Sequence, residues 1–267
     1  MTEEELRVVW DAMSSVVADR MKVYTRSFVA ILAGDSKVGT GTFIKQEEVR
    51  LLTCEHVARF YPVAYHVDDR GTTNIQPLIW CVEPDESKDV AMASIPAVEW
   101  ESSITTVRPL PIAKFAPSHR PVENELLFFR GIAGENVGYI GNFGSDVILT
   151  GYCSQEKRGT SDKDIFEILW SPKNSTISRG TSETARERLK HDDPAGFSGS
   201  LVWNTRFVEL GCNISRWSPD DAVVTGLLRR YDDDTDTLLA WRAEHMHAWL
   251  QSQRCTNQDL CNTPPLP

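Results

Sequence analysis

The stretch Gly196-Phe197-Ser198-Gly199-Ser200, which the apolar run Leu201-Val202-Trp203 follows, decides the fold prediction for this chain. A nucleophilic serine needs a tight turn that exposes its hydroxyl. Flanking glycines let backbone N–H groups converge on an oxygen that becomes negative during attack. A Gly-x-Ser-Gly string also occurs by chance, because glycine and serine are abundant residues. Alone, the string therefore leaves a glycine-rich β-turn as the simpler interpretation.

Two strings upstream change this interpretation. Residues 51–57 (LLTCEHV) place His56 just after a buried-looking strand, and residues 88–95 (KDVAMASI) place Asp89 at the start of another. A serine hydroxyl needs an imidazole to take its proton, and the imidazole needs a carboxylate to fix its tautomer. The chain supplies these three groups in the order His56, Asp89, Ser198.

Together with the Gly-rich strand at residues 39–44 (GTGTFI), these strings resemble the motifs of the trypsin/chymotrypsin-like serine peptidases, in particular their intracellular bacterial branch. The strings match that family's motifs in its order, and the resemblance covers about residues 25–232. It implies a mainly β fold with two antiparallel β-barrels and an active site between them. It also implies His56 as general base, Asp89 as its orienting partner and Ser198 as nucleophile.

The resemblance further implies a serine endopeptidase that cleaves proteins or peptides through an acyl-enzyme. The backbone N–H groups of Gly196 and Ser198 would form the oxyanion hole. Such a mechanism requires no metal and no organic cofactor. The histidines on the last helix are not predicted to form a metal site. His245 and His247 lie two residues apart, so their rings point in different directions.

Substrate preference rests on two further positions. In the family, the residue about six before the nucleophile often forms the floor of the primary specificity pocket, and here that residue is Asp192. An acidic floor would select Arg or Lys before the cut bond. A solvated acidic turn is the other interpretation of Asp192 and Asp193. On the strand expected to wall the pocket, Arg230 or Arg229 could instead favour acidic or neutral residues.

Two departures from the family pattern bear on activation and compartment. Many secreted members carry an Asp just before the nucleophile, and it pairs with a newly cleaved N-terminus. Phe197 stands at that position here, so activation by N-terminal trimming is not expected. Cys54 lacks the downstream half-cystine that secreted relatives pair across the histidine loop, which fits a reducing compartment.

The flanking segments read as helices around a β-rich region. Thr2 and Glu5 fit a capping box, and apolar residues then recur at helical spacing to about residue 22. Short β-type runs follow, among them Phe207–Leu210, and a second helix is expected from Thr237 to about Ser252. The predicted divisions are an N-terminal helical extension at 1–24, a peptidase domain at 25–232, a C-terminal helix packed on it at 233–252, and a flexible tail at 253–267.

The segment 171–193 is polar, charged and rich in Ser and Thr at its centre. A loop of this length inside a compact domain is usually mobile or functional. A short helix at 183–190 fits its Ala and Glu content. This segment also suggests an alternative to an active peptidase, namely a catalytically silent peptidase-fold binding module. In that alternative, the segment covers the cleft until a regulatory protein partner moves it.

Composition excludes several other classes. The 267 residues include 28 Lys and Arg against 38 Asp and Glu, a net charge of −10, so no global positive field attracts nucleic acid or an anionic membrane. No apolar run approaches the roughly 20 residues of a membrane helix. The six cysteines form no CxxC pair and are expected to be reduced. With its acidic N-terminus, the chain is predicted to be a cytoplasmic protein.

An α/β-hydrolase would use the order Ser198, an aspartate within 232–236, then His245 or His247. The segment after Ser198 reads as a strand rather than a helix, and no βαβ alternation is visible. The sequence therefore favours the double-barrel peptidase.

Overall fold

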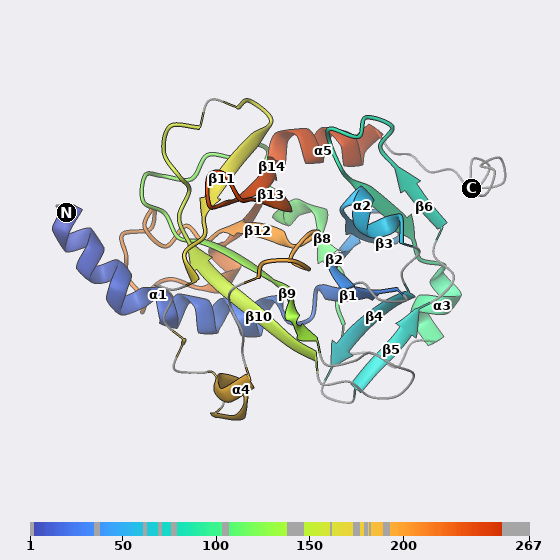
Figure 1. Ribbon diagram of the computed structural model, residues 1–267, viewed down its shortest axis with the longest axis horizontal. Coiled ribbons are helices and arrows are strands. Elements are labelled where there is room, and N and C mark those ends of the chain that lie inside the picture. Colours follow the sequence, from blue (N-terminus) through green and yellow to red (C-terminus); the bar gives the residue numbers. More distant parts are fainter. Residues whose placement is uncertain are drawn as a thin grey trace.

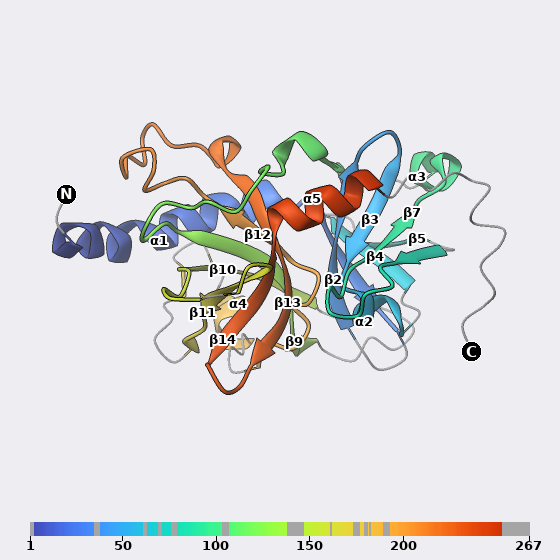
Figure 2. The same cartoon turned by 90° about the horizontal axis from the view of Figure 1, so that it is seen from above.

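The computed structural model of this chain describes residues 3–34, 38–60, 63–68, 71–75, 79–102, 107–137, 147–160, 162–172, 177–178, 181, 183–188 and 193–252. Two β-sheets lie side by side, with one helix at each end of the described chain (Figures 1 and 2). Within these residues no helix has the length and apolar character that crossing a membrane requires.

The first sheet has eight strands in the described chain, in the order β5-β4-β1-β2-β3-β7-β6, with β8 paired to β2. Its strands are β1 (Val29–Ala33), β2 (Val38–Lys45), β3 (Val49–Thr53), β4 (Val63–Asp68), β5 (Gly71–Ile75), β6 (Ile79–Val82), β7 (Ala91–Ser94) and β8 (Leu110–Pro111). All pairings are antiparallel except that between β2 and β8. The strands β1 and β3 are buried along their whole length, as expected for the centre of a sheet.

The second sheet has six described strands in the order β10-β9-β12-β13-β14-β11, all antiparallel. Its strands are β9 (Leu127–Val137), β10 (Val147–Ser154), β11 (Ile165–Leu169), β12 (Leu201–Asn204), β13 (Val223–Asp232) and β14 (Thr237–Arg242). The prediction of a mainly β fold with two antiparallel β-barrels and terminal helices is confirmed in its two antiparallel sheets and its helices. In the described pairings neither sheet closes into a complete ring.

Helices flank and connect the sheets. They are α1 (Glu3–Thr25), α2 (Glu55–Ala58), α3 (Ala97–Ser102), α4 (Glu183–Arg188) and α5 (Ala243–Ser252), with 3-10 turns η1 (Ile112–Lys114) and η3 (Pro219–Asp221). The helix α1 packs on β9 and β10, and its N-terminal end projects beyond the strands (Figure 2). The helix α5 starts on the second sheet and ends against the first, where Gln46 Nε2 donates to the Leu250 carbonyl at 3.3 Å. It thereby ties the two sheets together.

The predicted start of the C-terminal helix at Thr237 was wrong. Residues 237–242 form β14, which lies between β13 and β11, and the helix begins only at Ala243. Apolar runs such as Leu238-Leu239 fit a buried strand as well as a helix, and tertiary pairing decides between them. The sheet consequently extends past residue 232.

The predicted strand Phe207–Leu210 is also wrong, because these residues form a turn. The carboxylate of the buried Glu125 accepts the N–H groups of Val208 and Glu209, both at 3.0 Å. Burial raises the pKa of Glu125, and these hydrogen bonds oppose that shift. A turn whose N–H groups are satisfied by a carboxylate 83 and 84 residues away leaves no local signal in the sequence.

Candidate active site

His56 is placed by the end of a central strand. The strand β3 stops at Thr53, Cys54 precedes α2 in an extended conformation, and His56 is the second residue of that short helix. The backbone is therefore fixed by the sheet, while the imidazole stays 47% exposed. An exposed ring on a rigid backbone can reach a substrate without losing its orientation.

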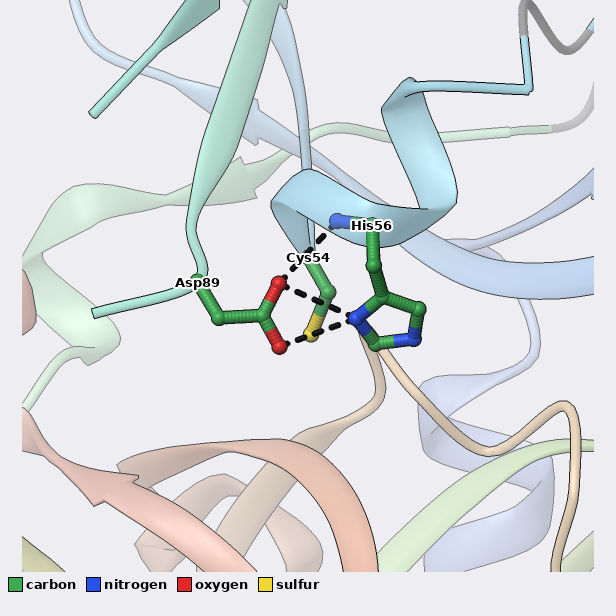
Figure 3. Close-up of side chains that lie close together, drawn as sticks. All are labelled: Cys54, His56 and Asp89. Atoms are coloured by element: carbon green, nitrogen blue, oxygen red, sulfur yellow. Dashed lines mark hydrogen bonds and ion pairs between the residues drawn. The ribbon is translucent and has the colours of Figure 1, made fainter. Parts of the chain in front are cut away.

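Asp89 lies opposite His56, just before β7, the strand that pairs with β3. Its φ of 47° is in the left-handed region, which aspartate tolerates better than most residues. The carboxylate accepts the His56 backbone N–H at 3.0 Å and lies 2.9 and 3.0 Å from His56 Nδ1 (Figure 3). These three contacts fix both the position and the rotation of the imidazole.

The same geometry sets the tautomer of His56. An ionised carboxylate has no proton to donate, so the contact with Asp89 places the imidazole proton on Nδ1. Nε2 then carries a free lone pair. A neutral imidazole of this form can accept a proton from a hydroxyl on its other side.

Ser198 lies on a tight turn at the start of the second sheet's β12. Gly196 and Gly199 have φ angles of 99° and 90°, which L-residues with side chains rarely adopt. A Cβ at Gly199 would also collide with the Thr40 carbonyl oxygen and the Thr53 hydroxyl. The glycines in this motif are therefore required both for the turn and for its close approach to the first sheet.

Thr40 on β2 holds this turn. Its N–H donates to the Ser198 carbonyl at 3.0 Å, and its hydroxyl donates to the Gly196 carbonyl at 2.8 Å. The same hydroxyl accepts the Ile132 N–H at 3.1 Å, and the Thr40 carbonyl accepts the Thr53 hydroxyl at 2.7 Å. A single residue thus links the strand before His56 to the turn of Ser198. The sequence showed Thr40 only as part of a Gly-rich strand.

The Ser198 hydroxyl forms its hydrogen bond with a residue other than His56. Its Oγ donates to the Arg229 carbonyl on β13 at 2.7 Å, and among the described hydrogen bonds none joins it to His56. The structure thus brings His56 and Asp89 together directly, and it brings Ser198 to the same junction through Thr40. It does not form the serine–imidazole hydrogen bond.

The side chain of Phe197 anchors the turn in the core of the second sheet. Its fully buried ring packs edge-on against Phe129 and Tyr152, at centroid distances of 5.3 and 5.4 Å, and 6.0 Å from Trp170. This aromatic cluster belongs to the core of the second sheet. Apolar packing therefore holds the residue before Ser198 in a position that does not depend on an ion pair.

The backbone amides of the turn fall into two groups. The N–H groups of Phe197, Gly199 and Ser200 donate to the carbonyls of Pro194, Leu228 and Phe197, respectively. For Gly196 and Ser198, the described residues provide no acceptor for the backbone N–H. These two amides are the donors that an external oxygen could use.

The two predicted specificity residues are placed differently. Asp192 lies outside the described residues, and Arg230 on β13 is exposed. Its neighbour Arg229 is buried, with Nε 3.9 Å from Asp89 Oδ2. Arg229 also lines a cavity of about 540 Å³ between the loop before Asp89 and α5. The cation beside Asp89 was not anticipated, because only the sheet register turns this side chain towards the carboxylate.

Cys54 lies next to the His56–Asp89 pair, and its sulfur is seen between the carboxylate and the imidazole in Figure 3. Its thiol is fully buried and contacts the Leu228 carbonyl at 3.2 Å. Burial, and secondarily the charge of Asp89, raises the pKa of the thiol well above its usual value. The cysteine is therefore protonated at neutral pH.

Comparison with known proteins places the fold. No family profile and no curated protein matches this chain. Among solved structures, it is similar to the active form of the Rv3671c protease from M. tuberculosis, with 16% identity, 91% of this chain and 87% of that chain covered, and a TM-score of 0.52. It is also similar to the serine protease domain of the Sesbania mosaic virus polyprotein, with 13% identity, 84% and 92% coverage, and a TM-score of 0.49. The chain has the chymotrypsin-like serine protease fold.

Proposed function

We propose that this protein is a serine endopeptidase that hydrolyses protein substrates through an acyl-enzyme, with His56, Asp89 and Ser198 as its catalytic triad. The observation that carries the proposal is the His56–Asp89 pair, in which three contacts orient an exposed imidazole. A histidine held in this way is prepared to act as a base. The glycine turn of Ser198 lies at the same junction, on the opposite sheet.

The proposed reaction follows from these positions. Ser198 Oγ attacks the scissile carbonyl carbon while His56 Nε2 takes the hydroxyl proton, and Asp89 stabilises the imidazolium that forms. His56 then gives the proton to the leaving amine nitrogen as the C–N bond breaks. A water deprotonated by His56 attacks the acyl carbon, and the Ser198 oxygen leaves with the proton.

The negative oxygen of each tetrahedral intermediate would be bound by the N–H groups of Gly196 and Ser198. Support for this comes from the absence of any other acceptor for these amides in the described chain. The turn is held by Thr40 and by Phe197 before a substrate arrives. Preorganised donors of this kind give a large share of the rate enhancement in acyl transfer.

The orientation of the Ser198 hydroxyl supports a regulated enzyme. The hydroxyl must rotate away from the Arg229 carbonyl before His56 can take its proton. We propose that a partner or the segment 171–193 controls access to this step. On the basis of the sequence we further propose a preference for Arg or Lys through Asp192, with a preference for acidic or neutral residues through Arg230 or Arg229 as the alternative, and a bacterial cytoplasmic setting.

Proteolysis of a denatured protein substrate, with cut sites identified by mass spectrometry, tests the proposal. Ser198→Ala should lose about 10⁴-fold or more of the activity. The matched control is Ser200→Ala, two residues away, which removes a buried hydroxyl that has no hydrogen-bond partner in the described chain. Equal cleavage by Ser198→Ala would refute the triad. A folded wild type that cleaves nothing would instead favour the silent binding module.

A further inference from the structure

Three side chains of the candidate active site, a thiol, an imidazole and a carboxylate, could each bind a metal ion. Cys54 Sγ, His56 Nδ1 and an Asp89 carboxylate oxygen all lie within 4.8 Å of one another (Figure 3). In the part of the chain that the structure describes, this is the one group of three such side chains. The family mechanism uses the imidazole and the carboxylate, and it leaves the thiol without a role.

We propose that Cys54, His56 and Asp89 bind a Zn²⁺ ion, and that the bound ion inhibits the peptidase. The inhibition rests on the proposed function, whereas the binding does not. Zn²⁺ accepts thiolate, imidazole and carboxylate ligands with bonds of about 2.0–2.3 Å. In a tetrahedral site, such bonds place ligand atoms about 3.5 Å apart. Atoms at the outer limit of 4.8 Å would need to approach by about 1.3 Å, whereas His56 Nδ1 and the Asp89 oxygens, now 2.9–3.0 Å apart, would need to open by about half an ångström.

The accessibility of the three side chains is suited to such a site. Cys54 is fully buried and Asp89 is 9% exposed, so both are held in place by the sheet. His56 is half-exposed, so once its Nδ1 contacts with Asp89 are broken the ring has room on the solvent side to move and admit the ion.

The charges and protons balance without a further reagent. The Cys54 thiol releases its proton to solvent, and its sulfur bonds to the ion together with the carboxylate of Asp89. The two negative ligands neutralise Zn²⁺, and Arg229 keeps its place beside Asp89 at 3.9 Å. Nothing is oxidised or reduced.

Inhibition follows from which nitrogen the ion occupies. With the metal on Nδ1, a neutral imidazole carries its proton on Nε2. Nε2 is the atom that must accept the Ser198 proton in the proposed reaction. The ion also takes the Asp89 oxygens that hold Nδ1–H in the metal-free site. A bound Zn²⁺ thus removes the base without blocking the substrate path.

Binding can be measured without any activity by titrating the full chain with Co²⁺, which reports a thiolate ligand by a charge-transfer band in the near ultraviolet. The protein carries Cys255→Ser and Cys261→Ser to remove two other thiols. We expect the band at one equivalent in this background and in its Ser198→Ala variant. Cys54→Ser should abolish it, whereas the matched control Cys153→Ser should retain it. A band that survives Cys54→Ser, or no band in the background, would overturn the site.

Two further variants guard against a folding defect at the buried position. Cys54→Ala, with its fold checked by circular dichroism, replaces the thiol with a smaller side chain. His56→Ala changes a half-exposed ring and should weaken Co²⁺ binding by more than about 10-fold. Unchanged affinity in His56→Ala would contradict the proposed ligand set even if both Cys54 variants were unstable.

Inhibition is measured separately, as the Zn²⁺ concentration that halves the labelling of Ser198 by a fluorophosphonate, each variant compared with its own metal-free rate. Cys54→Ser should raise that concentration by more than about 100-fold. Equal sensitivity to Zn²⁺ would overturn inhibition through this site. A cobalt band without any labelling would mean that the peptidase proposal fails and the metal site stands. Labelling without a band would mean the reverse.

Discussion

The two halves of the candidate active site differ in how completely their contacts are formed. His56 and Asp89 share three contacts of 2.9–3.0 Å, whereas the Ser198 hydroxyl donates to the Arg229 carbonyl at 2.7 Å. The first pair lies within one sheet, at the adjacent ends of β3 and β7, where Thr53 pairs with Ala91. Ser198 lies on the turn that precedes β12 of the other sheet, and its carbonyl accepts the N–H of Thr40 on the first sheet.

This difference teaches that strand register alone assembles the base, while the nucleophile depends on a junction between sheets. Register is specified wherever a strand is buried, because a one-residue slip turns its apolar side chains outward. The Ser198 hydroxyl can instead change partner by rotation about a single bond. In the metal-free site, catalytic readiness would therefore depend on the orientation of the Ser198 hydroxyl.

Of the changes that test this difference, Asp89→Asn is expected to have the largest effect, because it disrupts the His56–Asp89 pair. The amide can donate to His56 Nδ1 and so favour the tautomer with its proton on Nε2. We expect kcat to fall by about 10⁴-fold, measured by hydrolysis of a peptide substrate. The control is Asp85→Asn, in the loop before Asp89, which should stay within about twofold. A loss of less than tenfold in Asp89→Asn would mean that the pair does not set the tautomer.

Thr40→Val tests the junction that places the other half. The change keeps the shape but removes the hydroxyl that donates to the Gly196 carbonyl and accepts the Ile132 N–H. Two unsatisfied groups of about 1–3 kcal/mol each should lower kcat by roughly 10- to 100-fold, with a smaller change in KM. Thr40→Ser should restore most of the rate. If the serine variant is as slow as the valine variant, the hydroxyl is not the element that matters.

Phe197→Leu tests whether packing anchors the nucleophile turn. Removing ring contacts with Phe129 and Tyr152 should lower the free energy of unfolding by roughly 1–2 kcal/mol, measured by urea denaturation. Peptide hydrolysis should fall severalfold, since the turn becomes less rigid. A variant that loses stability yet keeps full activity would show that the aromatic cluster supports the fold and not the turn.

The smallest expected effect concerns the thiol of Cys54, which lies next to the His56–Asp89 pair. A raised pKa keeps Cys54 protonated at pH 8, and only a thiolate reacts rapidly with iodoacetamide. We expect native protein to leave Cys54 unmodified, while protein in denaturant is alkylated there, as read by peptide mass spectrometry. Alkylation of Cys54 at similar rates in both states would contradict its burial.

Sequence reasoning reached the parts of the site that local chemistry specifies. Gly196 and Gly199 are needed for the turn itself, and His56 and Asp89 stand at strand ends, so short strings identify them. It missed Thr40, whose partner Gly196 lies 156 residues away in the chain. A contact of that range is visible only once the two sheets have formed.

The same distinction explains the errors in the fold. The strand at 237–242 was expected to be helical because an apolar run without turn residues suits both structures, and pairing with β13 and β11 decides the outcome. The turn at 207–210 depends on Glu125, a residue from a distant segment. In contrast, α1 was foreseen because its apolar residues recur with the helical period.

Labelling with a fluorophosphonate, followed by mass spectrometry of the intact chain, tests the central claim most directly. The reagent needs an oxyanion hole, a base and a nucleophilic serine together, but it needs no knowledge of the natural substrate. The account predicts a single adduct, located on Ser198 and absent from Ser198→Ala. No adduct on folded protein, or an adduct that persists in the variant, would contradict it.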